Sequence, residues 1–242
     1  KAANLLFHFF WHEYCDWYLE FSKNDLHNPE TRKTLKLTLY RLLQLLHPFI
    51  PFSTEELYRN IKSSDQPPLL QTEFPTFTSE RVFSHEFTEV EALKKIISKT
   101  RKTRAMNNIH PHHRLRIFLK SGSGKESSAL SRNMKYFDSL TRSAKTEIVP
   151  DFSHLPKGFR GSCLNWEILL PLDSDDDLRK ELSRLNRELD KMETQARNLE
   201  KKLSNNRLIN KSPASVVLQL KKDLRRIIDR RDRSRETIDD LS

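Results

Sequence analysis

Lysine and arginine side chains gather in two parts of this 242-residue sequence, and they are the residues best suited to a chemical role. Residues 93–172 carry 16 basic and 5 acidic side chains, and residues 195–235 carry 13 basic and 4 acidic ones. Such cations neutralise phosphates and release counterions, which holds a polyanion without reading its sequence. The candidates for this contact are Lys94, Lys95, Lys99, Arg101, Lys102, Arg104, Arg114, Arg116, Arg197, Lys201, Lys202, Arg207, Lys211, Lys221, Lys222, Arg225 and Arg226.

Nine histidines also invite a metal or catalytic interpretation. His110, His112 and His113 lie close together, but a zinc site needs three or four ligands in fixed geometry. The two cysteines, Cys15 and Cys163, are far from this group in the sequence. We therefore expect exposed loop histidines and no metal site.

The acidic pairs and the glycines favour no enzymatic chemistry within these residues. Glu55 and Glu56 fit a helix start, and residues 175–177 are three aspartates that would complement a helix N-terminus. Only four glycines occur, and Gly122 and Gly124, the two nearest to each other, do not continue into a glycine-rich nucleotide loop, which excludes such loops. We find no nucleophile beside a base, and we predict no catalytic residue and no cofactor.

Aromatic residues near the start of the chain have two possible roles. Trp11, Tyr14, Trp17 and Tyr18 could stack on bases, as aromatic rings do in single-strand recognition. Their setting among many apolar residues favours packing in a core instead, and Cys15 beside them is expected to be an inert core thiol.

The first part of the chain has the pattern of a helical bundle. Apolar spacing predicts helices over 1–22 and about 30–46, and the His-Pro pair that follows ends the second one. Ser53 is predicted to cap a short third helix that runs to about Ile61, with Glu56 completing a capping box.

The middle of the chain predicts a small α+β module. A helix is expected over 86–105 and another near 126–140, with strands over 113–119, 145–149 and 164–170. In the first of these strands, alternation places Arg114, Arg116 and Phe118 on the face opposite to the buried leucine and isoleucine side chains.

The tail has a seam of mostly apolar residues at alternating steps of four and three, and packing should weaken where Arg231 and Ser234 occupy it. The first series is Leu178, Leu182, Leu185, Leu189, Met192, Ala196, Leu199 and Leu203. After a break the series resumes as Val217, Leu220, Leu224, Ile227, Arg231, Ser234, Ile238 and Leu241. Two matched heptad arms around a break predict an antiparallel coiled-coil hairpin with arms of roughly 40 Å. Its polar surface accounts for a hydrophobic content of only 36%.

The predicted fold class is therefore mainly α. Residues 1–84 would form part of a helical bundle, residues 85–172 a small basic α+β module, and residues 173–242 a coiled-coil hairpin. No apolar run is long enough for a transmembrane helix, and we expect no membrane partner.

Several motifs resemble the valyl-tRNA synthetase family. Residues 10–20 (FWHEYCDWYLE) and 42–57 (LLQLLHPFIPFSTEEL) are similar to helices of its anticodon-binding bundle. Residues 97–111 are similar to the helix after that bundle. Residues 199–205 (LEKKLSN) and 210–214 (NKSPA) resemble the turn of its C-terminal coiled coil.

This resemblance implies tRNA binding, through the bundle and through the coiled coil. The catalytic signatures of class I synthetases are absent from these residues, as are the catalytic and editing domains, and the chain is expected to start in mid-bundle. The resemblance identifies no individual residue that reads an anticodon. Whether the protein is an enzyme stays open here, since valine transfer would require sequence outside these 242 residues.

Three functions remain as alternatives. The first is the RNA-binding C-terminal region of a valyl-tRNA synthetase-like protein, whose partners are tRNA and the missing catalytic half. The second is a synthetase-derived structural protein of a ribonucleoprotein such as a mitochondrial ribosome, bound to structured ribosomal RNA and neighbouring proteins. The third is a coiled-coil scaffold that binds protein only. The expected location is mitochondrial or cytoplasmic, with basicity slightly favouring the mitochondrion.

Overall fold

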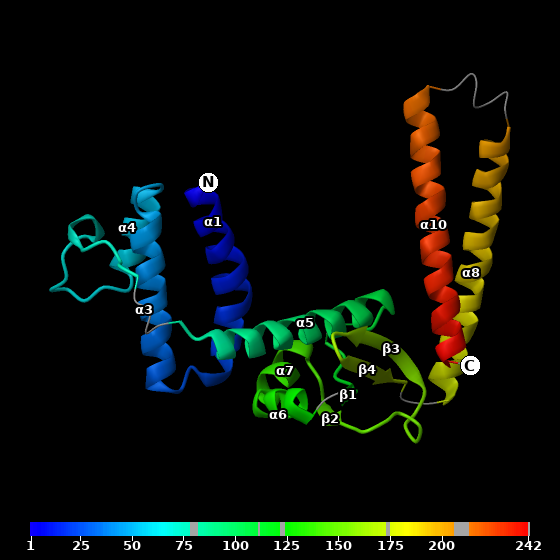
Figure 1. The fold of residues 1–242 in the computed structure, drawn as a ribbon, viewed down its shortest axis with the longest axis horizontal. Helices are drawn as coiled ribbons and strands as arrows, with labels where there is room; N and C mark the ends of the chain where they lie inside the picture. The colour runs from blue at the N-terminus through cyan, green and yellow to red at the C-terminus, as the bar shows by residue number, and fades with distance from the viewer. Residues whose placement is uncertain (78–81, 111, 122–123, 173–174, 206–212, 242) are drawn as a thin grey trace. The chain divides into compact units, whose positions relative to one another are not determined.

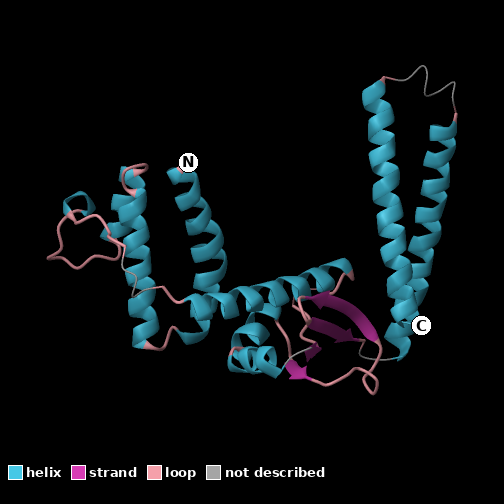
Figure 2. Ribbon diagram, viewed as in Figure 1, coloured by secondary structure: helices cyan, strands magenta, loops and turns pink. Residues whose placement is uncertain are grey.

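The fold is mainly α-helical, as the sequence predicts, and the described residues contain one four-stranded sheet (Figures 1 and 2). The computed structural model describes residues 1–77, 82–110, 112–121, 124–172, 175–205 and 213–241. These residues divide into two compact units, of which the helical unit is 1–93 with 132–140 and the sheet unit is 94–131 with 141–242. The three-part division of the sequence stays a prediction.

The helical unit begins with a single run of helix, as predicted for residues 1–22. Its consecutive parts are α1 (Ala2–His8), η1 (Phe9–Tyr18) and α2 (Leu19–Ser22), followed by the short turn η2 (Lys23–Asp25). The winding is wider in η1, where the N–H of Leu19 bonds to the carbonyl of Tyr14, five residues back. Tyr14 is buried, and its hydroxyl donates to the carbonyl of Leu35 at 3.2 Å, which ties η1 to α3 (Pro29–Leu46).

Two proline-led helices follow. In α3 the side chain of Asn28 accepts from the N–H of Glu30 at 2.9 Å, and Pro29 supplies the preset φ of the first turn. Helix α4 (Pro51–Arg59) also starts on a proline, two residues before the predicted cap Ser53. The predicted capping box is therefore wrong, because the fixed φ of Pro51 begins the helix earlier.

The core of this unit is small and the exposed apolar surface is large. Leu43, Tyr58 and Leu69 form a buried cluster, with Leu69 contributed by the short turn η3 (Leu69–Gln71). Trp11 is 52% exposed, so the expectation that it packs in a core is wrong, whereas it holds for Tyr14 at 4%. Apolar residues lie on more than one side of the helix over residues 2–22, and the described residues do not cover all of these sides.

Helix α5 (Ser84–Met106) runs from the helical unit into the sheet unit. The helix predicted near 126–140 is two helices, α6 (Gly124–Arg132) and α7 (Met134–Thr141). The strands are β1 (Arg116–Ser121), β2 (Lys145–Ile148), β3 (Gly158–Cys163) and β4 (Trp166–Pro171).

The strands pair in the order β2-β1-β4-β3, with β1 and β2 parallel and the other pairs antiparallel. β3 is missing from the sequence prediction, because its glycines and polar residues lack the alternation of a strand. A Cβ at Gly158 would lie 2.2 Å from the carbonyl oxygen of Leu170, so this residue must be glycine for β3 to pair with β4.

Both faces of the central strand β1 are buried. Ile117 and Leu119 are fully buried, as predicted, but Phe118 is only 3% exposed. The prediction that Phe118 faces outward with Arg114 and Arg116 is thus wrong for the phenylalanine. Its aromatic ring is buried on the face of β1 opposite to Ile117 and Leu119.

The tail is a pair of long antiparallel helices, α8 (Asp175–Ser204) and α10 (Ala214–Leu241). Every residue of both predicted apolar series is at least partly buried, so the predicted helical hairpin is confirmed. Its supercoiling stays a prediction. The C-terminal helix also packs against β3, and its last described residue, Leu241, is fully buried. None of the described helices is both long and apolar enough to span a membrane.

Candidate nucleic-acid interface

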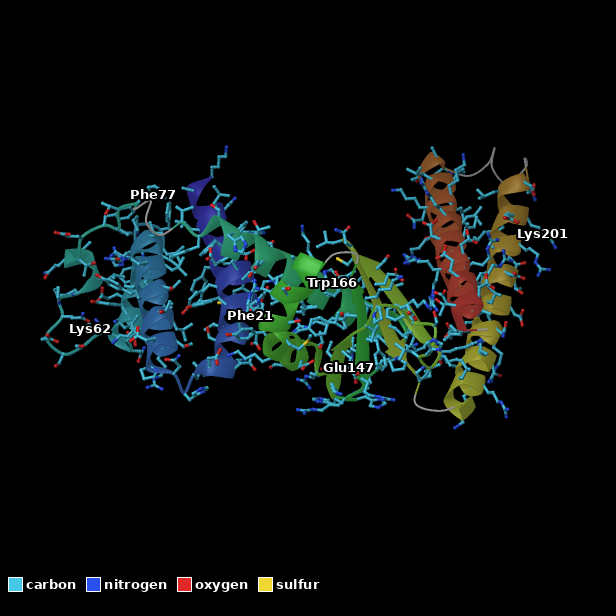
Figure 3. The ribbon with its side chains drawn as sticks, turned by 60° about the horizontal axis from the view of Figure 1, so that its bottom comes forward. Phe21, Lys62, Phe77, Glu147, Trp166 and Lys201 are labelled. Atoms are coloured by element: carbon cyan, nitrogen blue, oxygen red, sulfur yellow. The ribbon has the colours of Figure 1, made fainter. Side chains whose placement is uncertain are left out.

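The hairpin tip, defined as described residues 195–205 and 213–227, carries 7 basic and 2 acidic side chains. Six of its cations are exposed and make no ion pair with any residue that the structure describes (Figure 3 labels Lys201). These six are Lys201, Lys202, Lys221, Lys222, Arg225 and Arg226. Heptad spacing explains their exposure, because the apolar positions between them occupy the face toward the partner helix.

The hairpin base, defined as residues 178–194 and 228–241, is balanced, with 9 basic and 9 acidic side chains. Arg184 reaches Glu181 at 2.5 Å and Glu188 at 2.7 Å, and the hydrogen bond to Glu181 is the main cause that raises the pKa of the guanidinium. Arg235 joins α10 to α8 by reaching Glu193 at 2.6 Å. Cations of the base are thus partly neutralised within the protein.

A shallow groove of about 400 Å³ lies between the two helices of the hairpin tip. Its lining residues are Gln195, Asn198, Leu199, Asp223, Arg226 and Ile227. The amides of Gln195 and Asn198 can both donate and accept hydrogen bonds. The 2′-hydroxyl of RNA also both donates and accepts hydrogen bonds, so these amides have the chemistry to pair with it.

Two predicted binding residues, Arg207 and Lys211, lie outside the described residues. Arg197 is exposed and lies 3.6 Å from Glu193, a distance typical of a weak surface ion pair.

The cations of α5 do not share one surface. Lys95, Arg101 and Lys102 are exposed, and Lys99 is half-buried. Lys94 and Arg104 are only 8% and 5% exposed, which corrects the expectation that they lie on open faces. The buried stripe of α5 is wide enough to include them.

The two arginines around the start of β1 are exposed, as predicted. The guanidinium of Arg116 lies over the ring of Phe118, with 5.8 Å between its central carbon and the ring centroid. This contact fixes the side chain while leaving its N–H groups open to solvent.

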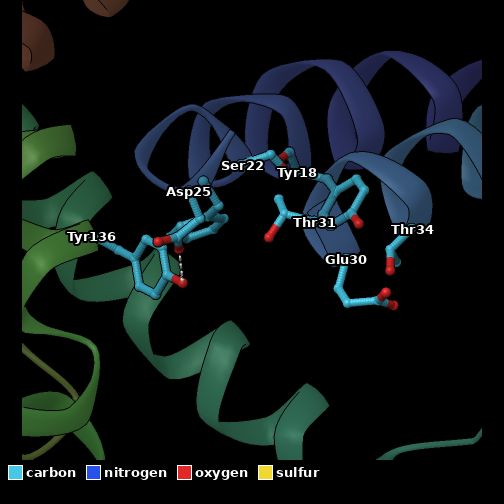
Figure 4. A pocket seen from close by; sticks show the side chains of 8 residues that line it. Tyr18, Ser22, Asp25, Glu30, Thr31, Thr34 and Tyr136 are labelled. Atoms are coloured by element: carbon cyan, nitrogen blue, oxygen red, sulfur yellow. Dashed lines mark hydrogen bonds between the residues drawn. The ribbon is translucent and has the colours of Figure 1, made fainter. Parts of the chain in front are cut away.

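The helical unit has a pocket of about 300 Å³ that sequence reasoning missed (Figure 4). Its lining residues are Tyr18, Phe21, Ser22, Asp25, Glu30, Thr31, Thr34 and Tyr136. Asp25 accepts from Lys135 at 2.7 Å and from the hydroxyl of Tyr136 at 2.6 Å, and these bonds, led by that from Lys135, lower the pKa of its carboxyl. More than one hundred residues separate these partners, so no local pattern predicts them. No lining side chain is basic, so the pocket does not suit a phosphate.

Histidines 110, 112 and 113 are exposed, as the sequence predicts. Among the described residues no three His, Cys, Asp or Glu side chains are grouped so that they could hold a metal ion.

Comparison with known proteins identifies both ends of the chain. Residues 1–119 match the family model described as the anticodon-binding domain of tRNA ligase. Residues 177–242, which contain nearly all of the helical hairpin, match the model described as the valyl tRNA synthetase tRNA binding arm. Both models describe RNA-binding parts of tRNA ligases, and the mainly α-helical fold agrees with them.

Relatives narrow the class further. The chain is 26% identical to a valine–tRNA ligase of Bacillus subtilis over 90% of its length, 28% identical to that of Oceanobacillus iheyensis over 100%, and 29% identical to that of Geobacter sulfurreducens over 96%. The matches cover 25%, 28% and 27% of these relatives, so the chain spans about a quarter of their length. The chain belongs to the valyl-tRNA synthetase family and corresponds to its C-terminal part.

Proposed function

We propose that this chain binds tRNA and positions it through phosphate contacts made chiefly by the hairpin tip. The observation that carries the proposal is the excess of exposed cations there that make no ion pair with any described residue, on a helix pair that matches a tRNA-binding arm. These residues would supply binding and orientation, and they contain none of the class I catalytic signatures.

Physical reasons favour the backbone of a folded RNA as the target. The major groove of an A-form helix is too narrow for a helical hairpin to enter, so shape, phosphates and 2′-hydroxyls remain to be contacted. Two helices of 30 and 28 residues offer a rigid arm of about 40 Å along which several phosphates can be met. Clustered cations also raise the local potential and speed association with a polyanion.

Binding of the whole chain to tRNA, measured by fluorescence anisotropy at low and moderate salt, tests the proposal. We expect tRNA to bind more tightly than an unstructured RNA of equal length, and the affinity to fall as salt rises.

Two outcomes would contradict the proposal. Preference for ribosomal RNA over tRNA would favour a structural role in a ribonucleoprotein. Absence of RNA binding at low salt would leave a scaffold that binds protein through its helices.

A further inference from the structure

Two arginines and a histidine meet at one edge of the sheet unit, and of these only Arg104 is among the predicted binding residues. Arg104 lies in the last turn of α5, His112 lies in the loop before β1, and Arg142 directly follows α7 and precedes β2. Arg104 is 5% exposed, and its Nη2 donates to the carbonyl oxygens of His110 at 3.1 Å and His113 at 2.5 Å. The guanidinium thereby fixes the course of the loop that presents His112.

Among the described residues, the positive charge of Arg104 has no counterion. Its Nη1 is buried without a hydrogen-bond partner, and within the described part of the chain no carboxylate pairs with Arg104 or with Arg142. Burial, and after it the charge of Arg142, lowers the pKa of the Arg104 guanidinium. A buried, uncompensated cation beside a second cation is unfavourable, and an anion bound nearby would relieve it.

Arg142 has a backbone conformation that normally belongs to glycine or asparagine. Its φ is 55°, in the left-handed region, at the position where helices often end on glycine. An arginine there costs conformational free energy that glycine would not, which suggests that its side chain has a function. The side chain is exposed and donates from Nη1 to Nδ1 of His112 at 2.6 Å.

The contact between Arg142 and His112 also sets the tautomer of the imidazole. A guanidinium can only donate, so Nδ1 of His112 must accept and the ring proton of the neutral form lies on Nε2. Arg142 keeps further N–H groups besides the one used here. Together the two side chains offer several donors, and within the described residues no carboxylate forms an ion pair with Arg142.

We propose that Arg142 and His112 bind a phosphate oxyanion, with Arg104 supplying a buried positive charge beside them. The planar fork of a guanidinium matches two phosphate oxygens, and the charge-assisted bonds that form are strong. For its source, the inference rests on the proposed function: the anion is a phosphodiester of bound tRNA. Free inorganic phosphate presents the same chemistry, and the experiment separates the two.

The probe is inorganic phosphate, titrated into the whole chain while the ring signals of His112 are followed by NMR. We expect saturable shifts in the wild-type chain. Arg142→Gly suits the φ of this position, so we expect unchanged or higher thermal stability together with phosphate affinity at least about tenfold weaker. Arg142→Lys keeps the charge without the fork and should fall between the two.

The matched control is Arg160→Gln, which removes an exposed arginine from β3, at the opposite edge of the sheet. It should leave the phosphate affinity unchanged. Absence of shifts at His112, or equal phosphate affinity for Arg142→Gly and the wild-type chain, would overturn the inference.

Addition of tRNA identifies the source of the anion. Displacement of phosphate by tRNA, with tRNA affinity also reduced in Arg142→Gly, supports a phosphodiester at this site. Retention of phosphate in the presence of tRNA supports a site for free phosphate. Because the phosphate titration needs no RNA, failure of tRNA binding would refute the proposed function while leaving this site to be judged alone.

Discussion

The two ends of the hairpin of α8 and α10 share one heptad seam but differ in charge. The base is electrically balanced, whereas the tip has an excess of positive charge. At the base, 9 cations face 9 acids, and Arg184 and Arg235 are held by carboxylates within the protein. At the tip, 7 cations face 2 acids, and most remain unpaired among the described residues. The same heptad pattern thus supports a base whose cations pair with carboxylates of the protein and a tip whose cations remain exposed to solvent.

The contrast extends to packing. The base lies beside the sheet, where α10 contacts β3 and Leu241 is fully buried. At the tip every described seam residue except Ala196 is half-buried, because a two-helix hairpin alone cannot enclose them. We infer that stability is concentrated at the base and RNA binding at the tip.

The largest effect on stability is expected from the seam at the base. Leu185 is 4% exposed, and Leu185→Ala should lower the free energy of unfolding by about 2–4 kcal/mol, since it removes apolar contacts and leaves a cavity. Leu203→Ala, at the half-buried tip, should cost about 1 kcal/mol. Chemical denaturation followed by circular dichroism measures both. Equal losses would contradict the inferred concentration of stability at the base.

A smaller loss of free energy of unfolding is expected when β3, the strand that α10 contacts at the base, is disturbed. Gly158→Ala places a methyl group against the backbone of Leu170 and Pro171, which cannot move aside as a side chain can. We expect a loss of about 1–3 kcal/mol in thermal or chemical unfolding. Gly161→Ala serves as the control, because its methyl group meets the side chains of Thr103 and Lys99, and it should cost less.

The smallest effect concerns the ion pair between the helices of the base. Arg235→Gln removes a partly exposed contact to Glu193 and should cost about 0.2–1 kcal/mol at low salt, with a smaller loss at high salt. Lys222→Gln at the tip removes an unpaired charge and should leave the stability unchanged. A loss in Lys222→Gln as large as that in Arg235→Gln would mean that the tip cations are also stabilised within the protein.

The hairpin could be predicted because its apolar residues repeat regularly. Contacts between residues far apart in the sequence could not be predicted in this way. Leu185 and Leu224 belong to series in which each member supports the next, so the heptad spacing alone is enough to pair the two arms. β3 has no such repetition, and its pairing depends on the backbone approach at Gly158.

The candidate site could likewise be predicted only in part. Charge and heptad spacing together placed Lys201 and Lys221 on the open surface of the hairpin. Burial of Lys94 and Arg104 depends instead on how many sides of α5 are covered, which their own spacing does not reveal. The meeting of Arg142 with His112 joins two loops thirty residues apart and has no local signal.

The dependence of tRNA affinity on salt tests the central claim most directly. The tip variant Lys201→Gln, Lys202→Gln, Lys221→Gln, Lys222→Gln removes four exposed cations that lie off the seam. The base variant Arg179→Gln, Arg187→Gln, Lys191→Gln, Arg230→Gln removes the same number of exposed cations from the base.

We predict weaker tRNA binding by the tip variant, and a plot of log affinity against log salt that is shallower by roughly three, since each lost phosphate contact removes nearly one unit of slope. The base variant should keep the slope of the unsubstituted chain. An unchanged slope in the tip variant, or an equal loss in both variants, would contradict the claim that the hairpin tip is the surface that holds tRNA.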